Sequence, residues 1–323
     1  MEPLFLKPYF QPKIWGGRKL EEIFDYDLPD GDIGECWAIS GHRHGQSTVI
    51  NGEFAGTQLG DLWNEHREVF GNAKGDVFPL LSKILDAEDS LSVQVHPDNA
   101  YAAEHEGKGE LGKTECWYII DAEEGAELIY GHNAKTHEEL NEMMESGDWD
   151  HLLKYVPVKK GDFFYVPSGT VHALNKGILV LETQQSSDTT YRMYDYDRVD
   201  KATGEKRELH IKQSEDTITV PFTAPKLDIK KEEIGKNTIT TFVQSPMSKF
   251  FAVYEWLVKD ELSLSHRVGQ YTLASVITGS GKLVVDGVDY ELNKGDHFLI
   301  PAQIKEWTIK GDLQLIASES EEK

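Results

Sequence analysis

Two segments of the chain repeat one residue pattern at a constant spacing, and this repeat constrains the fold more than any other feature. Residues 159–181 read KKGDFFYVPSGTVHALNKGILVL, and residues 293–315 read NKGDHFLIPAQIKEWTIKGDLQL. In both segments Gly-Asp precedes a short apolar run, a proline closes that run, and Lys-Gly precedes a second strand-like run. Gly-Asp favours a tight turn into a strand, and proline ends a strand because it has no N–H to donate. The repeat therefore predicts two copies of one β-rich unit.

Short strand-like runs also dominate the rest of the chain. Runs such as SVQVH, CWYIID, ILVLETQQ and KLVVDG are rich in β-branched and aromatic residues and are separated by Gly, Asp and Asn. The pattern G-D-x-x-x-x-P, followed by a histidine near the end of the strand, resembles the second motif of the cupin superfamily of double-stranded β-helix barrels. We predict a mainly β protein with two cupin-type (jelly-roll) barrels and a few helices.

Helical spacing is limited to a few segments. Apolar residues in 59–71 lie near helical spacing, and so do those in 136–148. The second of these segments begins with Thr136 and has Glu139 three residues later, which is the pattern of a capping box.

A boundary between domains is expected within residues 221–237, PFTAPKLDIKKEEIGKN, which contain two prolines and mixed charge. The length of 323 residues suits two domains. We predict a catalytic metal-binding cupin domain over 1–220, with an N-terminal extension and a helical insert. A linker over 221–237 then leads to a C-terminal cupin-like domain without a metal site over 238–323.

Composition excludes several classes of partner. The net charge of −23 opposes binding to nucleic acid and to anionic membranes, so an anionic substrate would need a local positive site. No apolar run approaches the ~18 residues of a membrane span, and the N-terminus carries prolines and charges in place of the apolar core of a signal peptide. The two cysteines, Cys36 and Cys116, form no disulfide framework and are expected to be buried free thiols. We expect a cytoplasmic protein, monomeric or weakly dimeric, that acts on a small molecule.

The two copies of the repeat differ at one informative position. His172 follows the closing proline of the first copy, whereas Glu306 occupies the matching position in the second. A Gln-x-His stretch precedes the first copy only. We therefore place the chemistry in the first barrel and give the second barrel a structural or interface role.

Four polar residues of the first barrel form a candidate set of metal ligands. Period-two alternation places Gln94 and His96 on one face of a strand. Glu115 begins the next apolar strand, and His172 follows the strand FFYVP. Each residue alone is more often a core or loop polar group, but four of them at matching strand ends favour a metal site. One amide oxygen, two imidazoles and one carboxylate suit zinc, and also iron, manganese or cobalt.

Two cations are candidates for a catalytic role beside this set. Lys113 lies two residues before Glu115, on the same face if the segment is extended. Arg192 follows the strand ILVLETQQ and either forms a salt bridge with Asp188, Asp195 or Asp197 or stabilises negative charge on a substrate.

The stretch GHRHG at 41–45 offers a competing His-x-His pair. It is flanked by glycines, and Glu35 is the one carboxylate close to it in sequence. We interpret His42 and His44 as part of a loop near the mouth of the barrel.

Longer motifs resemble the type I mannose-6-phosphate isomerases (phosphomannose isomerases) of the short bacterial form. The resemblance extends over nearly the whole chain, and QVHP, GKTE, PSGTVHAL and TTYRMYDYDR are together highly specific. The motifs that carry it are KPYFQPKIWGG (7–17), IGECWAIS (33–40), FPLLSKILDAEDSLSVQVHPDNAYA (78–102), GKTECWYI (112–119), YVPSGTVHAL (165–174) and ETQQSSDTTYRMYDYDR (182–198).

The resemblance implies a zinc-dependent aldose–ketose isomerase of carbohydrate metabolism. It would interconvert D-mannose 6-phosphate and D-fructose 6-phosphate through a cis-enediol. One Zn²⁺ per chain would be bound by the four residues already named, Gln94, His96, Glu115 and His172. The active-site arginine of the family falls on Arg192.

The roles of the cavity lysines stay open at this point. Lys113 is the candidate for proton transfer, and we expect the metal and Arg192 to lower its pKa from a value near 10.4. Binding of the phosphate is the other role for Lys113, and Lys83 is a weaker phosphate candidate. Some longer family members have a histidine where this chain has Gly112, so no residue is assigned to ring opening. The alternatives are a non-catalytic sugar-phosphate-binding cupin and a metal-dependent oxygenase.

Overall fold

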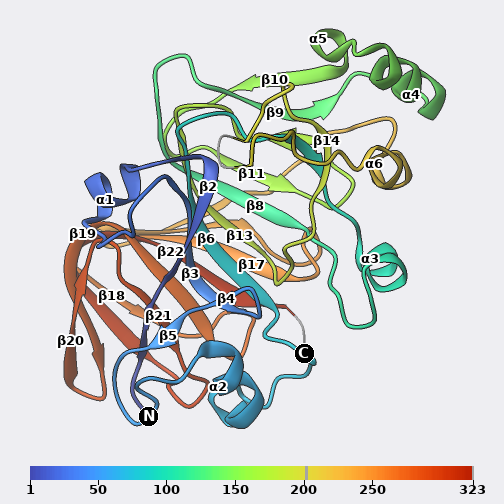
Figure 1. The fold of residues 1–323 in the computed structure, drawn as a ribbon. Coiled ribbons are helices and arrows are strands. Elements are labelled where there is room, and N and C mark those ends of the chain that lie inside the picture. Colours follow the sequence, from blue (N-terminus) through green and yellow to red (C-terminus); the bar gives the residue numbers. More distant parts are fainter. Residues whose placement is uncertain (201–202, 322–323) are drawn as a thin grey trace.

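The computed structural model describes residues 1–200 and 203–321, and its strands form three sheets (Figure 1). The seven-stranded sheet contains β2 (Tyr9–Gly17), β3 (Ile33–His42), β4 (Gly45–Gln46), β6 (Leu80–Ala87), β8 (Glu115–Ala122), β11 (Phe163–Val166) and β13 (Ile178–Gln185). The five-stranded sheet contains β7 (Val93–Val95), β9 (Glu127–His132), β10 (Leu153–Pro157), β12 (His172–Ala173) and β14 (Tyr191–Tyr194). The ten-stranded sheet contains β1 (Leu4–Lys7), β5 (Thr48–Val49), β15 (Lys230–Ile234), β16 (Asn237–Val243), β17 (Phe251–Val258), β18 (Glu261–Leu264), β19 (Thr272–Val285), β20 (Val288–Asn293), β21 (His297–Ile300) and β22 (Trp307–Ser320).

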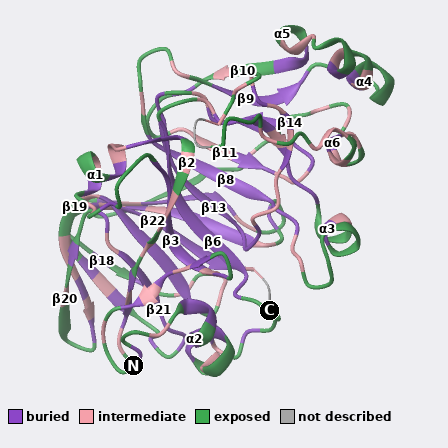
Figure 2. Ribbon diagram, viewed as in Figure 1, coloured by how far each residue is buried: buried purple, intermediate pink, exposed green. Residues whose placement is uncertain are grey.

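Helices are short and lie outside the sheets (Figure 1). They are α1 (Lys19–Phe24), α2 (Leu59–Glu65), α3 (Asn99–His105), α4 (His137–Ser146), α5 (Trp149–Leu152), α6 (Ile211–Thr217) and a 3₁₀ turn, η1 (Arg67–Phe70). Figure 2 shows that the buried residues are concentrated in the sheets, whereas the helices other than α2 are mostly exposed or intermediate. The prediction of a mainly β protein with few helices is confirmed. In the described part of the chain, no helix has the length and apolar character that crossing a membrane requires.

The two predicted helical segments are only partly helical. Helix α4 begins where the sequence indicates, and the Thr136 side chain accepts a hydrogen bond from the backbone N–H of Glu139 at 3.2 Å. The segment 59–71 forms α2 and then breaks at His66, whose backbone φ of −129° is not helical, before η1 begins.

The repeated segments adopt the same turn in both barrels. Gly161 and Gly295 have φ of +88° and +91°, which L side chains rarely adopt. The side chains of Asp162 and Asp296 each accept a hydrogen bond from the backbone N–H three residues earlier, at 3.0 and 2.7 Å. These matched bonds set the entry into β11 and β21, which explains why the Gly-Asp pair appears in both copies.

One apolar core joins the seven-stranded sheet to the ten-stranded sheet. Cys36 and Cys116 face this core, are free thiols and are buried, as predicted. Burial raises the pKa of both thiols, so they are unreactive packing residues. The rings of Phe163 and Phe242 stack across the interface with centroids 4.4 Å apart.

We expect Phe242→Ala to lower the free energy of unfolding by about 3–5 kcal/mol, because it removes a buried ring and leaves a cavity. The shared core predicts that both barrels unfold in one transition. Urea titration followed by tryptophan fluorescence measures the change, with Ile234→Ala on the exposed strand β15 as the control. Two separate transitions, of which only one shifts, would contradict the shared core.

The N-terminal strand β1 lies in the ten-stranded sheet, with the strands of the C-terminal part of the chain. Strand β1 pairs with β21, and β5 pairs with β1, so both belong to the ten-stranded sheet. The stretch expected to be a linker, 221–237, contains β15, which pairs with β16. The division into 1–220, 221–237 and 238–323 stays a prediction, and these pairings show that the first fifty residues contribute to both barrels.

Candidate metal centre and active site

The four predicted metal ligands lie together inside the first barrel. His172 on β12 pairs with Gln94 on β7, and Glu115 begins β8 on the facing sheet. The Nε2 atoms of His96 and His172 are 3.1 Å apart. Glu115 Oε1 lies 3.3 Å from His172 Nε2, and Glu115 Oε2 lies 3.5 Å from His96 Nε2. His96, Glu115 and His172 are buried, and their ligand atoms lie within 4.8 Å of one another.

Backbone carbonyls orient both imidazoles toward the centre of this cluster. His96 Nδ1 donates to the carbonyl of Thr189 at 2.9 Å, and His172 Nδ1 donates to the carbonyl of Thr170 at 2.8 Å. Each Nε2 atom therefore presents a lone pair to the cluster. Burial lowers the pKa of His96 well below its usual range and that of His172 to about 4, so both rings are neutral at pH 7.

This donor set fits a divalent metal ion. Two lone pairs 3.1 Å apart repel each other unless a cation lies between them. Glu115 Oε1 is buried and has no hydrogen-bond partner in the described part of the chain. The amide of Gln94 lies 3.4 Å from His172 Nε2, and a half-turn of that amide would present its oxygen to the same point. The arrangement could hold one metal ion through two nitrogens and two oxygens.

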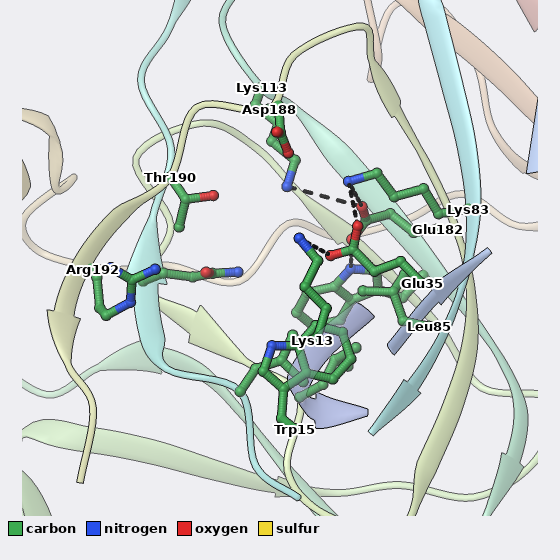
Figure 3. A pocket seen from close by; sticks show the side chains of 14 residues that line it. Lys13, Trp15, Glu35, Lys83, Leu85, Lys113, Glu182, Asp188, Thr190 and Arg192 are labelled. Carbon is green, nitrogen blue, oxygen red and sulfur yellow. Dashed lines mark hydrogen bonds and ion pairs between the residues drawn. The ribbon is translucent and has the colours of Figure 1, made fainter. Parts of the chain in front are cut away.

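A cavity of about 270 Å³ opens beside the cluster (Figure 3). It is strongly charged, in contrast to the apolar cores around it. Its cations are Lys13, Lys83, Lys113 and Arg192, and its carboxylates are Glu35, Glu182 and Asp188. Four cations in one cavity of a chain with net charge −23 form the local positive site that an anionic ligand requires.

One row of cross-strand neighbours forms a wall of this cavity. Trp37 on β3 pairs with Lys83 on β6, Lys83 pairs with Glu182 on β13, and Glu182 pairs with Trp117 on β8. The indole of Trp117 donates to Glu182 at 3.0 Å, and the indole of Trp37 donates to Glu35 at 2.6 Å. Side chains alternate between the two faces of a strand. The Glu and Trp of each Glu-Cys-Trp triplet therefore point to the cavity side of the sheet, and the cysteine points to the opposite side. This alternation explains why the triplet occurs twice.

Lys113 connects the metal cluster to this wall. Its Nζ lies 2.9 Å from Glu115 Oε2, 3.0 Å from His96 Nε2 and 3.9 Å from Glu182 Oε1. Burial lowers the pKa of Lys113, but the carboxylates of Glu115 and Glu182 outweigh burial and raise it above the ordinary value. The protein groups therefore raise the pKa of Lys113, whereas we expected the metal and Arg192 to lower it.

Arg192 is held by neutral groups. Its Nε donates to Ser92 Oγ at 3.2 Å and its Nη1 to the carbonyl of Glu208 at 2.8 Å. On β14 it pairs with Gln94, so it lies beside the metal cluster. Among the described residues, the salt bridge that the sequence left open is not formed. The three aspartates have other partners: Asp188 pairs with His44, Asp195 with Arg198 and Arg207, and Asp197 with Lys206.

Known proteins resemble this chain over its whole length. The family model described as phosphomannose isomerase type I, catalytic domain, matches residues 4–128, and the mannose-6-phosphate isomerase cupin domain matches 238–320. The mannose-6-phosphate isomerase of Streptococcus mutans is 56% identical over 99% of each chain. The chain belongs to the type I phosphomannose isomerases. This membership confirms the family that the sequence motifs indicated.

Solved structures agree with the fold of this type I phosphomannose isomerase. The crystal structure of the mannose 6-phosphate isomerase from Bacillus subtilis is 51% identical, covers 99% of this chain and 100% of its own, and has a TM-score of 0.94. A putative mannosephosphate isomerase from Archaeoglobus fulgidus, 21% identical, covers 99% and 98% with a TM-score of 0.74 and supports the fold alone.

Several residues that line the charged cavity of this family member were not singled out from the sequence. Lys13, Glu35 and Glu182 all lie in motifs that carry the family resemblance, but none has a local pattern that indicates its direction. The twin Glu-Cys-Trp triplets were the available signal for Glu35. His42 and His44 line a neighbouring cavity of about 390 Å³ and are outside the metal cluster.

Proposed function

We propose that this protein is a metal-dependent isomerase that interconverts D-mannose 6-phosphate and D-fructose 6-phosphate. The observation that carries the proposal is the buried His96–Glu115–His172 cluster, whose neighbours Gln94 and Lys113 line a cavity with four cations in an acidic chain. Relatives that are 50–56% identical over nearly the full length and carry the name mannose-6-phosphate isomerase support the same substrate.

The metal centre is assigned to one Zn²⁺ held by Gln94, His96, Glu115 and His172. The N₂O₂ donor set and the neutral imidazoles support zinc, while other divalent ions suit the same ligands. When bound, the ion supplies positive charge for the oxygens on carbons 1 and 2 of the open-chain sugar.

Arg192 is assigned to the developing negative charge of the enediolate. It lies beside Gln94, and its charge is not neutralised by a carboxylate among the described residues. A partly buried guanidinium stabilises such a charge more strongly than it would in water.

Lys113 is assigned to proton transfer between carbons 1 and 2. A base there removes the proton from carbon 2 while the carbonyl oxygen on carbon 1 gains a proton, which gives the enediol. Return of the abstracted proton to carbon 1, with loss of the hydroxyl proton from the oxygen on carbon 2, completes the ketose. Lys113 must release its own proton first, and its contacts with Glu115 and Glu182 oppose that release. Binding of the phosphate therefore stays the second role for Lys113. Lys83 stays the weaker phosphate candidate, because it is buried between Glu35 and Glu182 at 3.7 and 3.8 Å.

We also place the protein in the cytoplasm, as a monomer or a weak homodimer with a small-molecule partner. Two buried free cysteines support a reducing compartment. The high negative charge supports neither nucleic-acid nor membrane binding.

A coupled assay that follows conversion of mannose 6-phosphate to fructose 6-phosphate tests the proposal. We expect activity in purified protein, less than about 1% of it after chelation, and recovery on addition of zinc. Turnover that survives complete removal of metal would contradict the metal-dependent mechanism. Absence of turnover in folded, zinc-loaded protein that still binds the sugar phosphate would favour the non-catalytic binding protein.

A further inference from the structure

We propose that Lys13 binds the phosphate group of the substrate and holds it at the end of the cavity away from the metal centre. This inference rests on the proposed function and assigns a substrate contact that the sequence did not indicate. Figure 3 shows Lys13 extending from β2 toward Glu35, with Arg192 on the other side of the cavity. The Nζ of Lys13 lies 3.4 Å from Glu35 Oε1.

The charges already present in the cavity single out Lys13. Lys83 lies between Glu35 and Glu182, and Lys113 lies against Glu115, so both lysines are surrounded by carboxylates. Their side chains are 3% and 6% exposed, whereas that of Lys13 is 29% exposed. Within residues 1–200 and 203–321, Lys13 pairs with no carboxylate but Glu35, which also pairs with Lys83, so that one negative charge faces two cations. A dianionic phosphate gains more from Lys13 than from either buried lysine.

The stem of Lys13 is held by the packing of β2 on β3. A Cβ atom added at Gly34 would lie 2.6 Å from Lys13 Cβ and 2.8 Å from Lys13 Cγ. A Cβ added at Gly16 would lie 2.3 Å from the backbone nitrogen of Gly34. The two glycines let the strands approach closely and place the stem of Lys13 across the backbone of β3. Lys13 is therefore positioned by the fold, unlike an ordinary surface lysine.

The distance between the two ends of the cavity suits the substrate. Glu35 on β3 and Glu115 on β8 are separated by the strands β6 and β13. Strands lie about 4.8 Å apart, so three strand spacings separate the backbones of β3 and β8 by roughly 14 Å across the sheet. The long side chain of Lys13 reaches into this span from the Glu35 end. A hexose with its reacting carbons 1 and 2 at the metal and a phosphate on carbon 6 extends along the same direction.

The test compares Lys13→Gln, Lys13→Arg and the exposed control Lys7→Gln in the zinc-loaded full chain. We expect Lys13→Gln to raise the KM for mannose 6-phosphate at least about tenfold, with kcat within about threefold of wild type, because a charged contact to phosphate is lost from substrate and transition state alike. The inhibition constant of inorganic phosphate should rise by a similar factor. Lys13→Arg should restore most of both values, and Lys7→Gln should leave them unchanged.

Other outcomes separate this inference from the proposed function. An unchanged KM and an unchanged inhibition constant for phosphate in Lys13→Gln would overturn the inference while leaving the isomerase intact. A fall in kcat at constant KM would also overturn it, since Lys13 would then act on the reacting atoms. If the wild type turned over no mannose 6-phosphate, the proposed function would fail, and calorimetric binding of inorganic phosphate to wild type and Lys13→Gln would still test Lys13.

Discussion

Glu115→Gln is expected to release the metal ion and to lower kcat/KM by at least about 10³-fold. Glu115 is the only carboxylate of the ligand set, and both of its oxygens face the imidazoles of His96 and His172 at 3.3 and 3.5 Å. The amide keeps the shape but removes the negative charge that balances a divalent cation. Loss of several kcal/mol of charge stabilisation in the transition state corresponds to a decrease of this size.

Metal content measured by mass spectrometry, together with the coupled assay, checks this expectation. Glu110→Gln is the matched control, because Glu110 pairs with exposed Arg43 and lies outside the metal cluster. We expect this control to keep one metal ion per chain and wild-type activity. A Glu115→Gln variant that retains stoichiometric zinc and full activity would remove Glu115 from the ligand set.

The residues of the candidate metal cluster could be predicted from the sequence because each of them lies on or beside a strand. Alternation on a strand placed Gln94 and His96 on one face, and the repeat located the strand that ends before His172. The absence of a histidine at Glu306 distinguished the two copies. The antiparallel pairing of β12 with β7 then brings these residues together, as the cupin-like pattern implied.

The residues on the other side of the cavity could not be predicted from the sequence in this way. Lys13 and Glu35 form an ion pair only because β2 crosses β3 at Gly16 and Gly34, and that close approach has no signature in the local periodicity. The effect of the surrounding carboxylates on the pKa of Lys113 was likewise not predicted from the sequence. Glu115 and Glu182 both raise this pKa, and Glu182, which is distant in sequence, reaches Lys113 through the pairing of β13 with β8.

Pairing between distant strands explains the remaining differences in the fold. Strand β1 is only four residues long and carries no mark that directs it to β21 rather than to a neighbour in the first barrel. The charged segment KKEEI of β15 resembles a linker in composition, yet it forms an exposed edge strand because β16 offers it a partner. Local composition describes how exposed such a segment is, and the partner strand decides whether it is ordered.

Arg192→Ala is expected to lower kcat by about 10²–10³-fold while raising KM less than about tenfold. The guanidinium lies beside the proposed ligand Gln94 and forms no ion pair with a carboxylate among the described residues, so its charge is available for the enediolate. An interaction that strengthens only as charge develops appears in kcat. Arg192→Lys keeps the charge without the planar fork and should fall between the wild type and Arg192→Ala.

Steady-state kinetics on zinc-loaded variants measure this split, with the exposed Arg43→Ala as the control. A change confined to KM would transfer Arg192 to phosphate binding and would leave the enediolate charge without a protein partner. We expect Arg192→Ala to act mainly on kcat and Lys13→Gln mainly on KM. These two effects test the roles of the two ends of the cavity independently. If chemistry is at the metal end and phosphate recognition at the Lys13 end, the effects of the two substitutions on kcat/KM should multiply in the double variant, because the side chains share no partner.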